Sequence, residues 1–232
     1  AMGRLLRLHT LLAGTACWAS FAIAQDSTSA YPATLAGHAL MPAASFIQPP
    51  ADAPADFAIS GKFSNGQRNE RVGSLEGLSA NRPTGMSLPF EGQPLQGHSG
   101  IKHMPDGSFW VLTDNGFGTK ANSADAMLHL SHYTIDFQRG DFKRLATVFL
   151  SDPDKKVPFR IVHEGTPARY LSGADFDPES FQLIGDSIWI GDEFGPYLIK
   201  TDLKGRVQAV FDVEADGLSL IHISEPTRPE RI

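Results

Sequence analysis

The chain has a single cysteine among its 232 residues and no stripe of basic residues. That cysteine, Cys17, lies in a segment that we expect to be removed, so the mature chain would have no disulfide and no cysteine-ligated zinc or iron site. The formal net charge is -6. Because nucleic acids are bound mainly through clustered Lys and Arg, we expect no nucleic-acid partner, and the charge is compatible with binding cations.

Long hydrophobic runs are also scarce, and the one that stands out lies near the N-terminus. Arg4 and Arg7 precede the run TLLAGTACWASFAIA, which ends in Ala22-Ile23-Ala24. A short basic segment, an apolar core too short to span a membrane comfortably and an A-x-A site are typical of a secretory signal. We therefore predict a signal peptide at residues 1–24 and a periplasmic or extracellular protein. The alternatives are an N-terminal core helix and a lipoprotein anchor on Cys17.

The last residues do not resemble the rest of the chain. The stretch LSLIHISEPTR, residues 218–228, resembles the read-through translation of a transposase-type sequencing adapter. On this interpretation residues 218–232 are a non-native tail, native sequence stops near Gly217, and the fold is incomplete. The alternative is a short strand, SLIHI, followed by a polar tail.

The remaining chain has a pattern typical of β-structure. Residues 25–60 are rich in Ala and Pro and predict an extended leader or edge strand. Residues 61–217 contain short apolar runs such as SFWVLT, LHLSHYTIDF, RLATVFL, SIWIGD, YLIKTD and VQAVFDV, separated by Gly, Asp, Asn and Pro turns. No window keeps a helical apolar period for three turns, so the predicted class is all-β.

A weak internal repeat refines this prediction. Trp110 and Trp189 lie 79 residues apart, and Asp114 and Glu193 each follow their tryptophan by four residues. A separation of 79 residues corresponds to about two units of the roughly 40 to 50 residues of a propeller blade. We therefore expect a β-propeller-like fold, with a β-sandwich as the alternative. In a propeller, residues just past such a strand emerge at a shared polar rim.

Five acidic residues occur close together at this predicted rim. In DFDPES, Asp175, Asp177 and Glu179 alternate, so on an extended segment all three would face one side. Asp192 and Glu193 follow the strand that we expect to pair nearby. Clustered carboxylates repel one another unless a cation or several donors neutralise them, and calcium prefers oxygen ligands. The prediction is a hard-metal site; the alternative is that the acids cap turns through their side chains.

Two stretches resemble a known family. SGADFDPESF (residues 172–181), followed by IWIGDEFGPYLIKTDLKGRV (residues 188–207), is similar to the phytase-like family, also called the esterase-like activity of phytase family. The earlier GHSGIKHMPDGSFWVLTDNGFG, residues 97–118, resembles that family's first acidic element. The resemblance covers roughly Leu75 to Val213. It implies an exported β-propeller-like domain with phosphoesterase activity.

Three further residues are candidates for the site. Asp114, in the turn-like stretch TDNGFG, is equivalent to Glu193 in the repeat and is predicted to join the metal ligands. His98 aligns with Asp177, so it could face the same rim as a general acid or substrate contact. His98-Ser99 lacks the G-x-S-x-G pattern of a serine nucleophile. Arg169 precedes the acidic element and could hold a phosphate through its planar fork, or it could be structural.

These residues predict an exported metal-dependent phosphoesterase acting on a small anionic or phosphorylated substrate. Glu193, Asp192 and His98 are the predicted catalytic residues. A divalent metal, calcium by preference, is the predicted cofactor. The alternatives are a calcium-stabilised propeller acting on another ester or lactone, and a non-catalytic binding propeller. We expect a monomer when the chain is full length, with no membrane attachment after signal cleavage.

Overall fold

The computed structural model describes residues 31–79, 81–215 and 218–219. The chain divides into two units, Ala1–Leu35 and Ala36–Ile232, and every strand and 3-10 helix of the described residues belongs to the second. The predicted signal peptide lies outside the described residues, as does most of the predicted non-native tail. In the part of the chain that the structure describes, regular structure consists of β-strands and two short 3-10 helices, η1 (Ala55–Ala58) and η2 (Lys120–Asn122), so the all-β prediction is confirmed. Among the described residues, no helix has the length and apolar character needed to cross a membrane.

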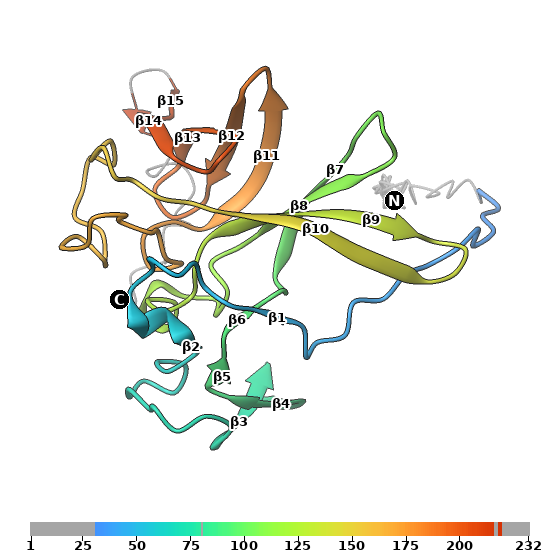
Figure 1. Ribbon diagram of the computed structural model, residues 1–232, viewed down its shortest axis with the longest axis horizontal. Coiled ribbons are helices and arrows are strands. Elements are labelled where there is room, and N and C mark those ends of the chain that lie inside the picture. Colours follow the sequence, from blue (N-terminus) through green and yellow to red (C-terminus); the bar gives the residue numbers. More distant parts are fainter. Residues whose placement is uncertain (1–30, 80, 216–217, 220–232) are drawn as a thin grey trace, which may run out of the picture. The chain divides into compact units, whose positions relative to one another are not determined.

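Two four-stranded antiparallel sheets position the site (Figure 1). The first contains β7 (His98–His103), β8 (Phe109–Thr113), β9 (His129–Asp136) and β10 (Asp141–Phe149). The second contains β11 (Pro178–Ile184), β12 (Ser187–Asp192), β13 (Tyr197–Asp202) and β14 (Val207–Asp212). In both sheets the strands pair in sequence order, which is the up-and-down arrangement of a propeller blade. The described strands form no closed ring.

The core lies between these two sheets. β11 packs against β7 and β8. Leu112 and Leu130 from the first sheet join Phe181, Ile190 and Ile199 from the second in one buried cluster. Because successive side chains of a strand point to opposite faces, the neighbouring residues Val111 and Trp189 face away from this core.

The prediction that the 79 residues from Trp110 to Trp189 span two blade units is wrong. Trp110 and Trp189 lie on β8 and β12, the second strands of two consecutive sheets, so 79 residues correspond to one unit and not to two. The extra length is residues 150–177, which contain turns and isolated bridges but no strand. The side chains of Leu150, Ile161 and Leu171 anchor this segment, because they are buried in the same hydrophobic core as the strands.

The other described strands pair in twos. β1 (Phe46–Ile47) pairs with β6 (Gln93–Pro94), and β2 (Ile59–Ser60) pairs with β5 (Phe90–Glu91). β3 (Leu75–Ser79) and β4 (Arg82–Leu88) form a hairpin. β15 (Glu214–Ala215) pairs with β16 (Leu218–Ser219), so the first two residues of the predicted tail are in a strand.

Candidate functional site

The candidate site is formed where β11 begins and β12 ends. These two strands are antiparallel, with Pro178 opposite Asp192, so the residues that precede β11 lie beside those that follow β12. The pairing then slips by one residue between Pro178 and Ser180, which leaves Glu179 as the extra residue of a β-bulge. A bulge redirects a side chain that a regular ladder would send to the other face. The local pairing therefore brings Asp177, Glu179 and Glu193 together.

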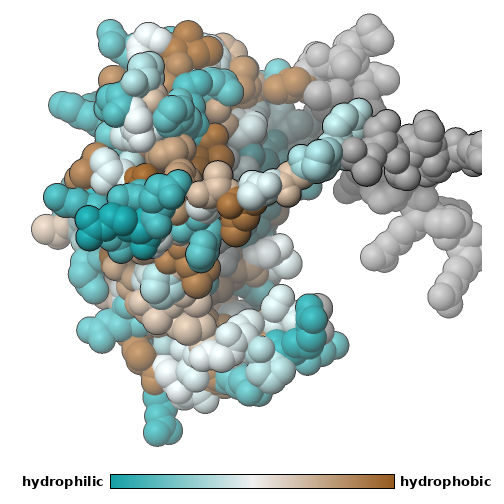
Figure 2. Space-filling view, turned by 90° about the vertical axis from the view of Figure 1, so that its right-hand side faces the viewer, coloured by the Kyte–Doolittle hydropathy of each residue, from teal (hydrophilic) through white to brown (hydrophobic). Residues whose placement is uncertain are grey.

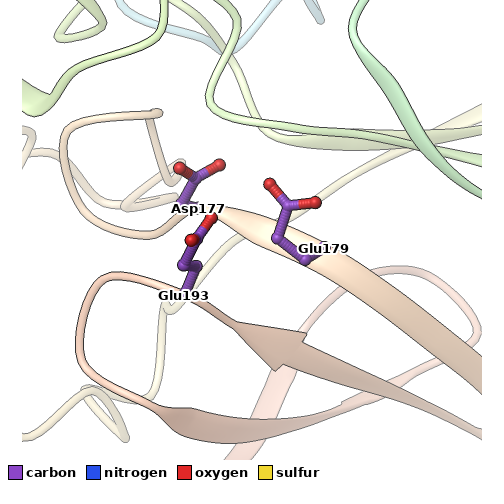
Figure 3. Close-up of side chains that lie close together, drawn as sticks. All are labelled: Asp177, Glu179 and Glu193. Carbon is purple, nitrogen blue, oxygen red and sulfur yellow. The ribbon is translucent and has the colours of Figure 1, made fainter. Parts of the chain in front are cut away.

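These three carboxylates are the main feature of the site (Figure 3). Their potential ligand atoms all lie within 4.8 Å of one another. Asp177 is buried, whereas Glu179 and Glu193 are exposed. Among the described residues, no Lys or Arg forms a salt bridge with any of them. Three mutually repelling charges without a basic partner are a site that a cation would stabilise.

Asp177 is held in place from the other sheet. The backbone N–H of Asn115 donates to Asp177 Oδ1 at 3.2 Å, and the Asn115 side-chain Nδ2 donates to Oδ2 at 2.7 Å. Asn115 is only 3% exposed, and its own Oδ1 accepts from Gly118 N at 2.7 Å. The main chain of Asp177 is fixed as well, because Glu193 N donates to its carbonyl oxygen at 2.9 Å. Asn115 is thus a positioning residue, and its place in the turn-like stretch TDNGFG gave no signal of that role.

Asp192 is the last residue of β12 and lies opposite Pro178. Its carboxylate binds backbone N–H groups rather than the side chains of the three clustered acids. Its Oδ1 accepts the backbone N–H of Asp177 at 2.7 Å, and its Oδ2 accepts that of Gly195 at 2.9 Å. Burial raises the pKa of Asp192, and these backbone N–H groups oppose that rise. The geometry makes Asp192 a residue that joins the start of β11 to the turn after β12. Its predicted roles as ligand and catalytic group stay predictions.

The expectation that three alternating acids face one side is wrong for Asp175. This residue belongs to a turn, not to an extended segment. Its carboxylate accepts hydrogen bonds from Ser172 N at 2.8 Å, Ser172 Oγ at 2.9 Å and Val162 N at 2.8 Å. The short Asp side chain caps its own turn, as the turn-capping alternative anticipated. Asp175 is therefore not brought to the cluster.

Asp114 borders the cluster from the first sheet. Its Oδ1 accepts from Gly116 N at 2.7 Å, and its backbone N–H donates to the Gly97 carbonyl oxygen at 2.7 Å. Partial burial raises the pKa of the Asp114 carboxyl, and the nearby charge of Asp177 adds to the rise. Burial likewise raises the pKa of Glu179, and Asp177, Glu193 and Asp114 all raise it further. The carboxylates of Asp114, Asp177, Glu179 and Glu193 therefore lie in one region of negative electrostatic potential.

His98 and Ser99 lie at the start of β7, next to Asp114. Between His98 and Gly100 the pairing with β8 slips by one residue, so Ser99 is the extra residue of a bulge like that at Glu179. The Ser99 hydroxyl lies near enough to the Glu179 carboxylate to oppose the rise that burial causes in its pKa. His98 is exposed as a whole residue, yet packing around its ring lowers the imidazole pKa. Sequence reasoning considered Ser99 only as a nucleophile and missed its place beside Glu179.

Arg169 lies outside this group of residues. It is 3% exposed, and its guanidinium forms salt bridges with Asp152 at 2.9 Å and Glu164 at 2.6 Å. Its Nε also donates to the Asp152 carbonyl oxygen at 2.8 Å. Because both sides of its planar fork already bind protein oxygens, Arg169 organises the segment between β10 and β11. The structure does not bring it to the acidic residues.

The donor set suits a hard cation. Calcium–oxygen bonds are about 2.3–2.6 Å long, so oxygens that share one ion lie within about 5 Å of one another. The three carboxylates meet that limit with their 4.8 Å spread. All the candidate ligands are oxygens, which are the donors that Ca²⁺, Mg²⁺ and Mn²⁺ prefer.

Comparisons with known proteins agree with the resemblance noted in the sequence. A family model described as "Phytase-like: Esterase-like activity of phytase" matches residues 93–221. This range covers more than half of the chain and contains both four-stranded sheets and every residue of the acidic cluster. No curated protein and no solved structure matches the chain.

Proposed function

Because the chain belongs to the phytase-like family, we propose that it is an exported, metal-dependent hydrolase of phosphoesters. Family membership supports a hydrolase with esterase-like activity. The observation that carries the metal-dependent part is the group of Asp177, Glu179 and Glu193, whose ligand atoms lie within 4.8 Å. No basic residue neutralises them among the described salt bridges.

Asp177, Glu179 and Glu193 would hold the metal, with Asp114 adding negative charge beside them. When bound, a divalent cation supplies a Lewis acid that polarises a phosphoryl oxygen and activates water for attack. Asp177 would be the rigid ligand, because Asn115 fixes both of its oxygens. Glu179 and Glu193 are exposed and could move to meet a substrate. Asp192 would keep the two ligand-bearing segments together.

His98 is the proposed proton-transfer residue. The lowered pKa of its imidazole keeps the ring neutral near pH 7, so one ring nitrogen can accept a proton from water or substrate. Its position at the start of β7, adjoining Asp114 through Gly97, places it on the border of the acidic cluster.

The test is hydrolysis by the full chain of p-nitrophenyl phosphate and bis(p-nitrophenyl) phosphate. Calcium, magnesium and manganese are supplied in turn, then removed with chelator and restored. We expect metal-dependent, reversible activity and a loss of at least about tenfold in Glu179→Gln, since even outer residues of metal sites matter that much. Glu91→Gln, at an exposed position on β5, is the matched control and should keep full activity. Absence of hydrolysis with every metal would contradict the proposal.

A carboxylic ester or lactone is the second candidate substrate. The family description, esterase-like activity, favours it. A panel of p-nitrophenyl acetate, butyrate and phosphate, assayed with and without chelator, separates the two. Faster, chelator-insensitive cleavage of the carboxylic esters would select the second candidate.

Export is proposed from the signal-like residues 1–24. When the full chain is produced in a bacterium with a periplasm, we expect the periplasmic protein to begin at Gln25. The mass of the N-terminal peptide measures this, and an intact Met2 segment in the cytoplasm would contradict it.

A further inference from the structure

A cavity of about 370 Å³ lies against the first sheet, next to the acidic cluster. Its wall is mainly apolar and includes Val111, Tyr133, Phe137 and Phe142, with Ala39 and Met41 from the segment before β1. On the face in Figure 2, brown apolar atoms occur in separate areas among hydrophilic ones, rather than in one continuous patch. The cavity volume falls in the range of small-molecule sites, about 300–1,000 Å³.

The cavity is separate from the space between the two sheets. Leu112 and Leu130 point into the buried core, whereas Val111 and Tyr133 line the cavity on the opposite face. Tyr133 is 1% exposed, so its ring is a fixed part of the wall. The cavity can therefore accept a ligand without parting β11 from β7 and β8.

The polar part of the wall adjoins the acidic cluster. His98 and Ser99 line the cavity, and Ser99 also lies beside the Glu179 carboxylate. The preceding residue, Gly97, is in contact with Asp114: a Cβ at Gly97 would collide with the Asp114 carboxylate. A ligand that fills the cavity would thus place one end at His98 and Ser99, beside the acids.

The charge of the wall limits the kind of ligand. The lining residues include no Lys and no Arg, and His98 is the only one of them that could become cationic. A ligand with several phosphates would find no counter-charge there, whereas an aromatic or alkyl group would be buried favourably.

We propose, resting on the proposed function, that this cavity binds the apolar aryl or alkyl group of a monoester whose ester group lies at His98 and Ser99 beside the acidic cluster. The substrate class is then an ester with one apolar substituent, not a polyphosphorylated sugar.

The first test measures binding without catalysis. 1-Naphthol, which has no phosphate, is titrated into the full chain and followed by its fluorescence. Ile101→Asp places a charge at the cavity on a residue that is 64% exposed, and Ile184→Asp makes the same change at a 60% exposed residue outside the cavity. We expect saturable binding that weakens by about tenfold or more in Ile101→Asp only. Equal affinities in the two variants, or no saturable binding, would overturn the proposal.

The second test uses turnover. With calcium present, KM for 1-naphthyl phosphate should be lower than KM for methyl phosphate by about tenfold or more, and Ile101→Asp should remove this difference. A difference that survives in Ile101→Asp would overturn the cavity assignment. If 1-naphthol binds as expected but no ester is hydrolysed, the proposed function fails while the cavity assignment stands.

Discussion

The acidic cluster predicts that one substitution changes stability in opposite directions with and without calcium. The perturbation is Glu193→Gln, which keeps the side-chain shape and removes one of three carboxylates within 4.8 Å. Two charges at this distance repel by about 1 kcal/mol in a water-like medium. Because Glu193 and Glu179 are exposed and screened, the total relief should stay near about 1 kcal/mol. For a domain of this size, that raises Tm by about 2–4 °C in chelator.

Bound calcium should reverse the sign of the change in Tm that Glu193→Gln causes. An ion at a hundred times its Kd stabilises the folded protein by about 2.7 kcal/mol, or about 5–10 °C in Tm. Loss of one ligand weakens this binding, so Glu193→Gln should melt below the wild type in calcium and above it in chelator. Thermal denaturation followed by circular dichroism across a calcium titration measures both effects.

The matched control is Glu91→Gln, also an exposed glutamate but on β5. It should shift Tm little in chelator and should leave the calcium-induced increase unchanged. An equal calcium-induced rise in Tm in the wild type and in Glu193→Gln would show that Glu193 is not a calcium ligand. A lower Tm of Glu193→Gln in both conditions would show that Glu193 stabilises the cluster without a cation, contrary to this prediction.

Three further predictions concern the residues around the site. Asp192→Asn turns an amide NH₂ group toward one of the two backbone N–H donors, so the free energy of unfolding should fall by about 2 kcal/mol. Asp186→Asn, in the exposed β11–β12 turn, is the control and should leave it almost unchanged; urea denaturation measures both. Burial lowers the pKa of His129 to about 4 from 6.5, so the unfolded chain binds the proton first. Stability should therefore fall by up to about 3 kcal/mol as pH drops from 6.5 to 4, and His129→Gln should remove most of this dependence. Tyr133→Phe deletes a buried hydroxyl that has no hydrogen bond of good geometry among the described residues, although the Ser131 hydroxyl is near enough to oppose the rise that burial causes in the Tyr133 pKa. Stability should therefore change by no more than about 1 kcal/mol, and a larger loss would contradict this.

Most strands could be predicted because they carry apolar side chains in a recognisable pattern. The runs SFWVLT, LHLSHYTIDF, RLATVFL, SIWIGD, YLIKTD and VQAVFDV coincide with β8, β9, β10, β12, β13 and β14. Within the two four-stranded sheets, the strands that were not predicted are β7 and β11, the first of each sheet; β3 to β6 were not predicted either. The sequences of β7 and β11, HSGIKH and PESFQLI, include glycine, proline and charged residues, because these strands hold the candidate site and are interrupted by bulges.

The site could be predicted only as a region. Sequence spacing located the acids around Asp177 and Glu193, and the pairing of β11 with β12 is confirmed. Spacing could not separate a carboxylate that faces its neighbours from one that caps its own backbone. The carboxylates of Asp175 and Asp192 both accept hydrogen bonds from backbone N–H groups. These hydrogen bonds depend on turns that form only when the chain folds. Nor could a sequence pattern foresee that Asn115 reaches across 62 positions to hold Asp177.

Asn115 links the candidate site to the packing of the two sheets, because it holds the Asp177 carboxylate. Asp177, Glu179 and Glu193 all come from the second sheet or its edges, but the donor that fixes Asp177 belongs to the loop after β8 of the first sheet. Opening the packing between the sheets would therefore release the Asp177 carboxylate from Asn115, while the pairing of β11 with β12 would still hold the three residues near one another. By the same linkage, a cation that binds the three carboxylates stabilises the packed arrangement of the sheets. Bulges at equivalent places in β7 and β11 bring Ser99 and Glu179 to this junction, so the candidate site depends on the contact between the sheets rather than on either sheet alone.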